Sequence, residues 1–250
     1  MLMTPGPTAV PAPVRDAMSR ELINPDVDPE FHRIYDRLTD RLATVYGVDR
    51  PGDGGGDRPD GDASARDVVV PGGEGILGLE AAVASLVEPG TEVLCLSNGR
   101  YGDGFADFVE SYGGEATVVG ADYDAPLPLA DLDAVLGDDD HEFDLATMVH
   151  CETPTGTLND VEPALELLKS ADGEILTVVD AVSSLGGVDV PTDRIDVCLG
   201  ASQKCFSAPP GLATAAISDR AWAAMAEREP HSLYTNFRPW RDTSEGFPYT

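Results

Sequence analysis

The sequence is poor in basic residues. Its 250 residues include 16 lysines and arginines against 45 aspartates and glutamates, which gives a formal net charge of -29 at pH 7. Lysine occurs only as Lys169 and Lys204. So much negative charge repels the phosphates of nucleic acids and anionic membrane surfaces, which argues against both as partners. The acids are spread along the whole chain. We interpret this as adaptation to high salt, which screens their mutual repulsion.

Long apolar runs and paired cysteines are also missing. No apolar stretch reaches the roughly 20 residues that a membrane-spanning helix needs, and the first residues do not resemble a secretory signal peptide. The chain has no Cys-x-x-Cys pair, and its cysteines lie in or beside apolar segments. We therefore predict a soluble, cytoplasmic protein without a metal site, in which the cysteines are buried free thiols. They are Cys95, Cys151, Cys198 and Cys205.

Short apolar, β-rich runs alternate with segments of helical periodicity. This alternation predicts an α/β fold with a mostly parallel seven-stranded sheet and helices on both faces. Ligands of such folds bind beyond the carboxyl ends of the strands, where this sequence places most of its polar motifs. The predicted strands are 67–71, 92–96, 116–119, 144–150, 175–180, 195–199 and 212–218, and the predicted helices are 29–46, 76–87, 104–112 and 161–170.

Composition divides the rest of the chain. Residues 1–20 begin rich in proline, and we expect them to form an extended N-terminal arm. Residues 21–250 are expected to form one large domain. Within it, residues 51–66 are rich in glycine and aspartate and are predicted to be a solvated, mobile loop.

Four polar motifs follow predicted strands. Lys204 follows the apolar run 195–199, and a lysine among apolar neighbours can lose its proton and form a Schiff base with a carbonyl group; a surface loop lysine is the alternative. Asp180 ends another strand, where it can pair with a cationic ligand atom or cap a helix. The glycine-rich turn 72–75 precedes an alanine-rich segment and can receive a phosphate at a helix start. Tyr101, on a loop after a strand, can stack on a planar ring or be structural.

Together these motifs resemble one family. The chain is similar to the class V, fold-type I pyridoxal phosphate enzymes of the alanine–glyoxylate and serine–pyruvate aminotransferase group. The resemblance is collinear over nearly all 250 residues, and its last two segments are the most specific. The six segments are Thr4-Pro5-Gly6-Pro7-Thr8, Gly78-Leu79-Glu80-Ala81-Ala82, Ser97-Asn98-Gly99-Arg100-Tyr101-Gly102, Glu152-Thr153-Pro154-Thr155-Gly156, the stretch from Val179 to Gly187, and the stretch from Ser202 to Gly211.

The resemblance implies how the ring of pyridoxal 5'-phosphate is held. Lys204 would form the Schiff base with the cofactor and later shuttle a proton. Asp180 would hold the protonated ring nitrogen. Tyr101 would stack on one face of the ring and Val182 would pack on the other. Thr153 would form a hydrogen bond near the ring hydroxyl.

The resemblance also implies how the phosphate is held. The backbone N–H groups of Gly75 and Ile76 and the side-chain amide of Gln203 would bind it. Thr250 would reach it from the neighbouring subunit of a homodimer. Glu74 departs from the family, which usually has a small hydroxyl residue at this position. Its carboxylate would repel the phosphate unless it turns away or pairs with a cation.

The implied function is a transaminase that moves an amino group from alanine or serine to glyoxylate or pyruvate. Family members continue into a C-terminal small domain whose arginine clamps the substrate carboxylate. The sequence ends before that domain, so we expect this chain to lack it. Two alternatives stay open: a non-catalytic domain or subunit that binds pyridoxal phosphate, and a related class V enzyme such as an aminoethylphosphonate transaminase.

Overall fold

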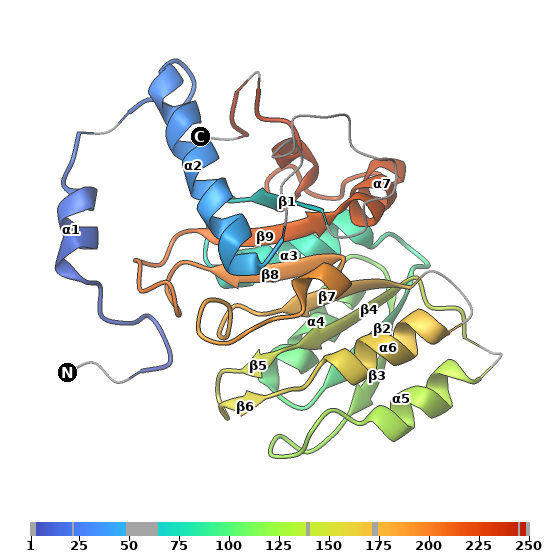
Figure 1. Cartoon of the computed structure of the whole chain (residues 1–250). Coiled ribbons are helices and arrows are strands. Elements are labelled where there is room, and N and C mark those ends of the chain that lie inside the picture. Colours follow the sequence, from blue (N-terminus) through green and yellow to red (C-terminus); the bar gives the residue numbers. More distant parts are fainter. Residues whose placement is uncertain are drawn as a thin grey trace.

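Figure 1 shows the computed structural model of the chain, which describes residues 4–21, 23–48, 65–138, 141–171, 175–244 and 246–248. Most of the predicted loop 51–66 therefore lies outside the described residues, as does Thr250. The end of that segment is not a loop, because Ala65 and Arg66 are buried and Arg66 begins the first strand.

A seven-stranded sheet crosses the molecule in the order β1-β9-β8-β7-β4-β2-β3. From β8 to β3 the neighbouring strands are parallel, and β9 runs antiparallel between β8 and β1. The prediction of a mostly parallel seven-stranded sheet is therefore confirmed. The strands are β1 (Arg66–Val69), β2 (Glu92–Ser97), β3 (Glu115–Gly120), β4 (Leu145–Val149), β7 (Leu176–Asp180), β8 (Val197–Ala201) and β9 (Ala213–Ser218).

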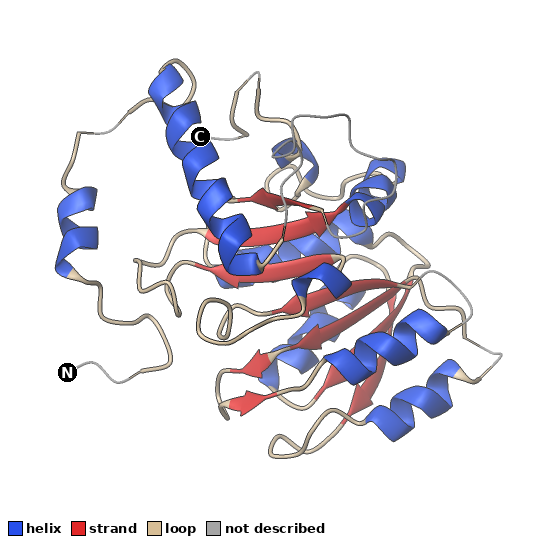
Figure 2. Cartoon of the chain, in the orientation of Figure 1, coloured by secondary structure: helices blue, strands red, loops and turns tan. Residues whose placement is uncertain are grey.

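Helices cover both faces of the sheet and enclose two hydrophobic cores (Figure 2). One core contains side chains of α3 (Gly75–Leu86), α4 (Arg100–Ser111) and α7 (Asp219–Glu227). The other contains side chains of α2 (Pro29–Tyr46), α5 (Leu129–Leu136) and α6 (Glu162–Ser170). Successive strand residues such as Val93 and Leu94 enter opposite cores. Because the central strands are covered on both faces, they appear in the sequence as unbroken apolar runs.

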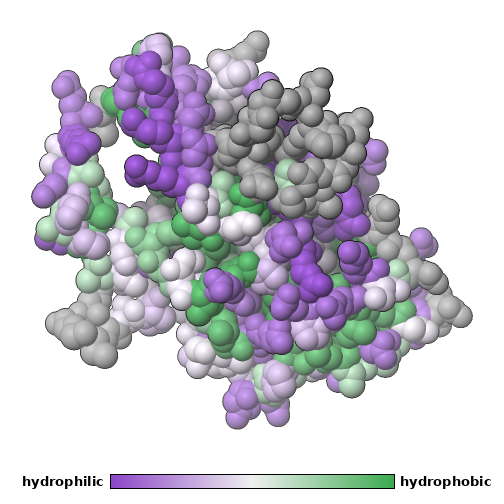
Figure 3. Space-filling model, in the orientation of Figure 1, coloured by the Kyte–Doolittle hydropathy of each residue, from purple (hydrophilic) through white to green (hydrophobic). Residues whose placement is uncertain are grey.

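Helix α2 is amphipathic, and its apolar face packs against the sheet. Its buried residues Leu42, Ala43 and Tyr46 lie at helical spacing and enter the second core. Its other face is hydrophilic and forms the purple column at the top of Figure 3. Asp28 caps the helix by accepting a hydrogen bond from the backbone N–H of Glu30 at 2.9 Å. The bounds predicted for this helix are those observed.

Several short elements escaped prediction. Helix α1 (Ala12–Met18) lies within the predicted arm, buries no residue and stands apart from the sheet in Figure 1. Helices α5 and α7, which are eight and nine residues long, were not among the predicted helices. Strands β5 (Cys151–Glu152) and β6 (Thr157–Leu158) form a small hairpin beyond the end of β4. The remaining elements are the 3-10 turns η1 (Thr192–Arg194) and η2 (Arg238–Trp240).

The cysteines depart in part from the expectation of buried thiols. All four are free; Cys95 and Cys198 are buried, and Cys151 is partly buried. Cys205 is exposed, because it lies in the turn after β8 rather than in the strand itself. In the described part of the chain, no helix has the length and apolarity needed to cross a bilayer. Nor do the described side chains form a cluster of three or more potential metal ligands.

Candidate active site

A cavity of about 160 Å³ opens beyond the carboxyl ends of β7 and β8. The strands fix its two principal residues, because Asp180 is the last residue of β7 and Lys204 lies three residues after β8. All predicted site residues within the described part of the chain border this cavity: Lys204, Asp180, Thr153, Tyr101, Val182, Gln203, Gly75 and Ile76. Five further residues complete its wall, namely Gly6, Pro7, Glu74, Leu79 and Ser183.

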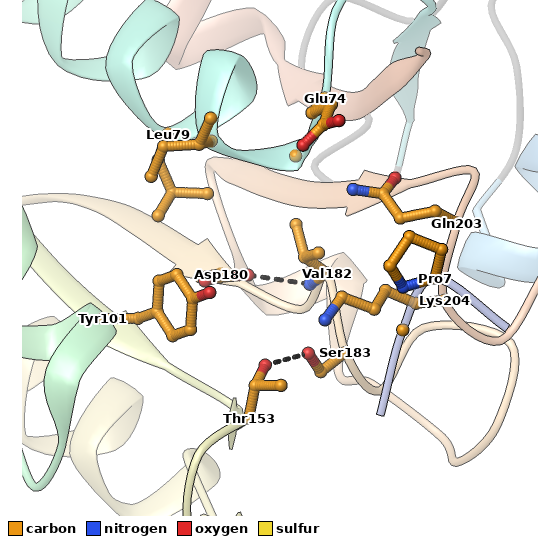
Figure 4. Close-up of a pocket in the computed structure, with 13 residues that line it drawn as sticks. Pro7, Glu74, Leu79, Tyr101, Thr153, Asp180, Val182, Ser183, Gln203 and Lys204 are labelled. Carbon is orange, nitrogen blue, oxygen red and sulfur yellow. Dashed lines mark hydrogen bonds between the residues drawn. The ribbon is translucent and has the colours of Figure 1, made fainter. Parts of the chain in front are cut away.

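Lys204 is half-buried and extends into the cavity (Figure 4). Its Nζ atom has no hydrogen-bond partner among the residues that the structure describes, so the amine is available to a ligand. Ser202 stabilises the turn that carries it. The Ser202 hydroxyl donates to the carbonyl of Pro209 at 2.6 Å, and the Ser202 carbonyl accepts from the N–H of Ala208 at 3.0 Å. The turn therefore holds Lys204 at a fixed place over the cavity.

The N-terminal arm lies against Lys204, which the sequence did not predict. The N–H of Thr8 donates to the carbonyl of Gln203 at 3.2 Å, and the Thr8 hydroxyl donates to the carbonyl of Lys204 at 3.3 Å. At Gly6 the φ angle is +147°, and a Cβ atom there would lie 2.5 Å from Cδ of Lys204. Only glycine allows this close approach. The arm is thus a wall of the cavity that constrains the lysine side chain.

Asp180 provides a buried carboxylate at the opposite side of the cavity. Its Oδ1 atom accepts a hydrogen bond from the N–H of Val182 at 2.8 Å and so stabilises the following turn. No helix begins at this turn, so the alternative of a helix cap is wrong. The pKa of Asp180 is raised to about 7, chiefly by burial and to a smaller extent by the charge of Glu152, although the Val182 N–H and the Lys204 charge act to lower it. A carboxylate in this position gains from a cationic partner. The protonated nitrogen of a pyridine ring is such a partner.

Tyr101 lies in the first turn of α4 rather than on a loop as predicted. The helix begins at Arg100, four residues earlier than expected, because Glu152 satisfies its first free N–H groups. The fully buried Glu152 carboxylate accepts from the N–H of Gly102 at 2.7 Å and from that of Tyr101 at 3.2 Å. A Cβ atom at Gly99 would lie 2.3 Å from Cδ of Glu152, so this approach also requires glycine.

Glu152 was not predicted as a site residue. Its place in the Glu-Thr-Pro-Thr-Gly segment was the only signal, and nothing in the sequence pairs it with a helix that begins 52 residues earlier in the chain. A negative charge near a helix N-terminus interacts favourably with the helix dipole. Because Glu152 binds the backbone of the turn that carries Tyr101, it positions the aromatic ring at the cavity.

We expect Glu152→Ala to destabilise the protein by about 3 kcal/mol, because buried N–H groups lose a charged acceptor and a void remains. The Glu152→Gln variant keeps an oxygen acceptor and nearly the same volume, so it should lose less. Urea unfolding followed by circular dichroism measures both. Equal unfolding midpoints for the wild type and the alanine variant would contradict this role.

The polar residues on the floor of the cavity are connected to one another. The hydroxyls of Thr153 and Ser183 form a short hydrogen bond (Figure 4). His150 is buried, and its Nδ1 is 2.8 Å from the hydroxyl of Ser184. Burial lowers the pKa of His150, which favours the neutral ring. His150 does not line the cavity.

The cavity ends at the N-terminus of α3, where the phosphate of the cofactor is expected. The N–H groups of Gly75 and Ile76 have no hydrogen-bond partner among the described residues. Gln203 is 7% exposed and turns its amide nitrogen toward the cavity, and its buried Oε1 has no hydrogen-bond partner in the described part of the chain. These donors suit an oxygen-rich group. Glu74 also borders this end, so the residues at the ring fit pyridoxal phosphate whereas those at its phosphate include an opposing carboxylate.

Comparison with known proteins shows which fold and family this chain shares. The alanine–glyoxylate aminotransferase of Nostoc sp. has a similar structure, with a TM-score of 0.84 at 25% identity over 99% of this chain and 62% of that one. The fold is that of the fold-type I pyridoxal phosphate enzymes. The class V aminotransferase family matches residues 65–236. The chain belongs to this family, whose enzymes use pyridoxal phosphate.

Two relatives are considerably longer than this chain. The pyridoxamine–pyruvate transaminase of Mesorhizobium japonicum is 31% identical over 256 residues, which are 99% of this chain and 60% of that protein. An uncharacterized aminotransferase of Methanocaldococcus jannaschii is 31% identical over 258 residues, which are 100% of this chain and 61% of the relative. The chain thus spans about 60% of the length of these relatives.

Proposed function

We propose that this chain forms the pyridoxal-binding part of a transaminase that moves an amino group from alanine or serine to glyoxylate or pyruvate. One observation carries the proposal: a free lysine amine and a buried carboxylate, Lys204 and Asp180, face the same cavity from the ends of neighbouring strands. Tyr101 and Val182 supply the walls that a flat ring needs. The family of the chain supports the reaction class.

Each residue would have a defined task. Bound pyridoxal phosphate supplies a carrier for the amino group and an acceptor for the electrons of the substrate Cα–H bond. Lys204 would bind the ring through Nζ and would then move the proton that leaves the substrate Cα. The Asp180 carboxylate would keep the ring nitrogen protonated by pairing with its N–H. Thr153 would orient the ring by a hydrogen bond to its hydroxyl group.

A second candidate, a cofactor-binding chain without turnover of its own, is favoured by one observation. Among the described residues that line the cavity there is no arginine, the residue best suited to clamp a carboxylate with two parallel hydrogen bonds. The small domain expected from the family would supply it. A homodimer in which Thr250 completes the neighbouring site remains part of the proposal, and sedimentation of the chain would test it.

The proposed function is tested by titrating the chain with the aldehyde form of the pyridoxal ring (the ring aldehyde) and then adding alanine or serine. We expect the ring absorbance to shift when the aldehyde binds to Lys204, and to change again when the amino acid converts it to the amine. Appearance of pyruvate or hydroxypyruvate would confirm amino transfer. A first shift without the second would favour the chain that binds but does not turn over. A spectrum identical to that of the free aldehyde would refute the proposal.

A further inference from the structure

Glu74 sets the charge at the α3 end of the cavity. It lines the cavity and directly precedes Gly75, the first residue of α3. Although Glu74 occupies the N-cap position, its side chain makes no capping hydrogen bond. No ion pair to Glu74 occurs within the described residues, and Figure 4 shows its carboxylate beside the open space. Its negative charge is therefore available to whatever group lies at this end.

The surrounding groups do not offset this charge. Phosphate sites in proteins combine a helix N-terminus with lysine or arginine side chains. Lys204 is the only basic residue among the described lining residues, and it is expected to be consumed by the bond to the ring. A helix N-terminus carries only about half a positive charge, less than the full negative charge of a carboxylate. The α3 end of the cavity is thus a poor site for a dianion.

We propose that this cavity selects a pyridoxyl ring that carries a hydroxymethyl group in place of the phosphate ester. A hydroxyl group can donate a hydrogen bond to the Glu74 carboxylate and accept one from the N–H of Gly75 or Ile76. A phosphate dianion can only accept, and it meets the carboxylate as a like charge. The buried amide of Gln203 adds a neutral partner at the same end. This inference rests on the proposed function, because it assumes that the ring lies between Asp180 and Lys204.

The choice of ligand changes the role of the ring. A phosphate anchors the ring as a resident cofactor, whereas a ring without it would leave once its bond to Lys204 is broken. The ring would then be a substrate. Pyridoxamine would give its NH2 group to a 2-oxo acid and take up the keto oxygen in exchange. Pyridoxal and an amino acid leave, so the atoms balance and no oxidant is needed.

Binding of pyridoxal and of pyridoxal phosphate to the wild type and to Glu74→Ser tests this inference. Both Kd values are read from the absorbance of the Lys204-bound ring in the same buffer. We expect the wild type to bind pyridoxal at least about tenfold more tightly than pyridoxal phosphate, since like charges at close range repel strongly in a partly enclosed site. The serine variant should shift this ratio at least about tenfold toward the phosphate ester, and Glu74→Gln should shift it in the same direction.

Glu115→Gln is the matched control, because it removes an exposed carboxylate of β3 outside the cavity and should leave the ratio unchanged. A wild type that prefers pyridoxal phosphate would overturn the inference while leaving the proposed function intact. So would a ratio that Glu74→Ser does not alter. If neither ring changes its absorbance with any of these proteins, the proposed function fails as well.

Discussion

Lys204→Ala is expected to abolish covalent attachment of a pyridoxal ring to this protein. The wild type, treated with the ring aldehyde and then with borohydride, should gain the mass of one reduced ring. The reason is chemical as well as geometric: attachment needs an amine, and Lys204 is the only one among the described residues that line the cavity. Mass spectrometry of the intact protein and of its peptides measures the adduct and locates it.

The chain offers a sharp control for this experiment. Lys169 is the only other lysine in the sequence and is exposed on α6, away from the cavity. Lys169→Ala should therefore be labelled as fully as the wild type. The N-terminal amine is present in every variant, so it contributes an equal background. Stoichiometric labelling of the Lys204→Ala protein would show that Lys204 is not the residue to which the ring is attached.

Asp180→Asn is expected to stabilise the ligand-free protein at alkaline pH. Burial raises the pKa of Asp180 from 3.8 in the unfolded chain to about 7 in the folded one. The folded state then holds a proton that the unfolded state releases, so stability falls as the pH rises from about 4 to about 7 and is level above that. At one pKa unit per 1.36 kcal/mol, the full loss is about 4 kcal/mol. The Asp180→Asn protein has no titrating group at this position, so its stability does not fall in this way as the pH rises.

The pH dependence distinguishes this effect from a general gain in packing. The variant and the wild type should differ least near pH 4 and most above about pH 7, with the gap widening by about 2–3 kcal/mol between about pH 5 and pH 8. Urea unfolding at several pH values measures the gap. A difference that is independent of pH would contradict the assignment to Asp180. The same variant should bind the pyridoxal ring more weakly, because it loses the charge that pairs with the ring nitrogen.

The sequence predicts the sheet better than the surroundings of the site. Strands such as β7 are buried on both faces and therefore form apolar runs that can be recognised in the sequence. Asp180 and Lys204 follow those runs, so their meeting at one edge of the sheet follows from parallel topology. Helix α5 lacks such a signal, because only Leu132 of its eight residues is buried. Helix α7 was missed although it is as long as the predicted helix α6.

Contacts between distant segments could not be predicted. The position of Tyr101 depends on Glu152, a residue of another strand whose carboxylate accepts hydrogen bonds from the first turn of α4. No local sequence pattern indicates that Glu152 and this helix start are in contact. The exposure of Cys205 depends on the course of a turn rather than on its apolar neighbours. The orientation of Glu74 toward the cavity likewise requires the packed structure, although its carboxylate stood out in the sequence as a departure from the family.

The contact between the arm and Lys204 has a consequence for how the protein folds. Thr8 and Lys204 are 196 residues apart in the sequence, and contacts of such long range form late because closing the intervening chain costs entropy. During synthesis the arm leaves the ribosome before β8, yet its binding surface exists only after β8 and the following turn have been made. The wall of the cavity is therefore completed after the sheet. Ring binding should appear later in refolding than the burial of Trp222 in the core.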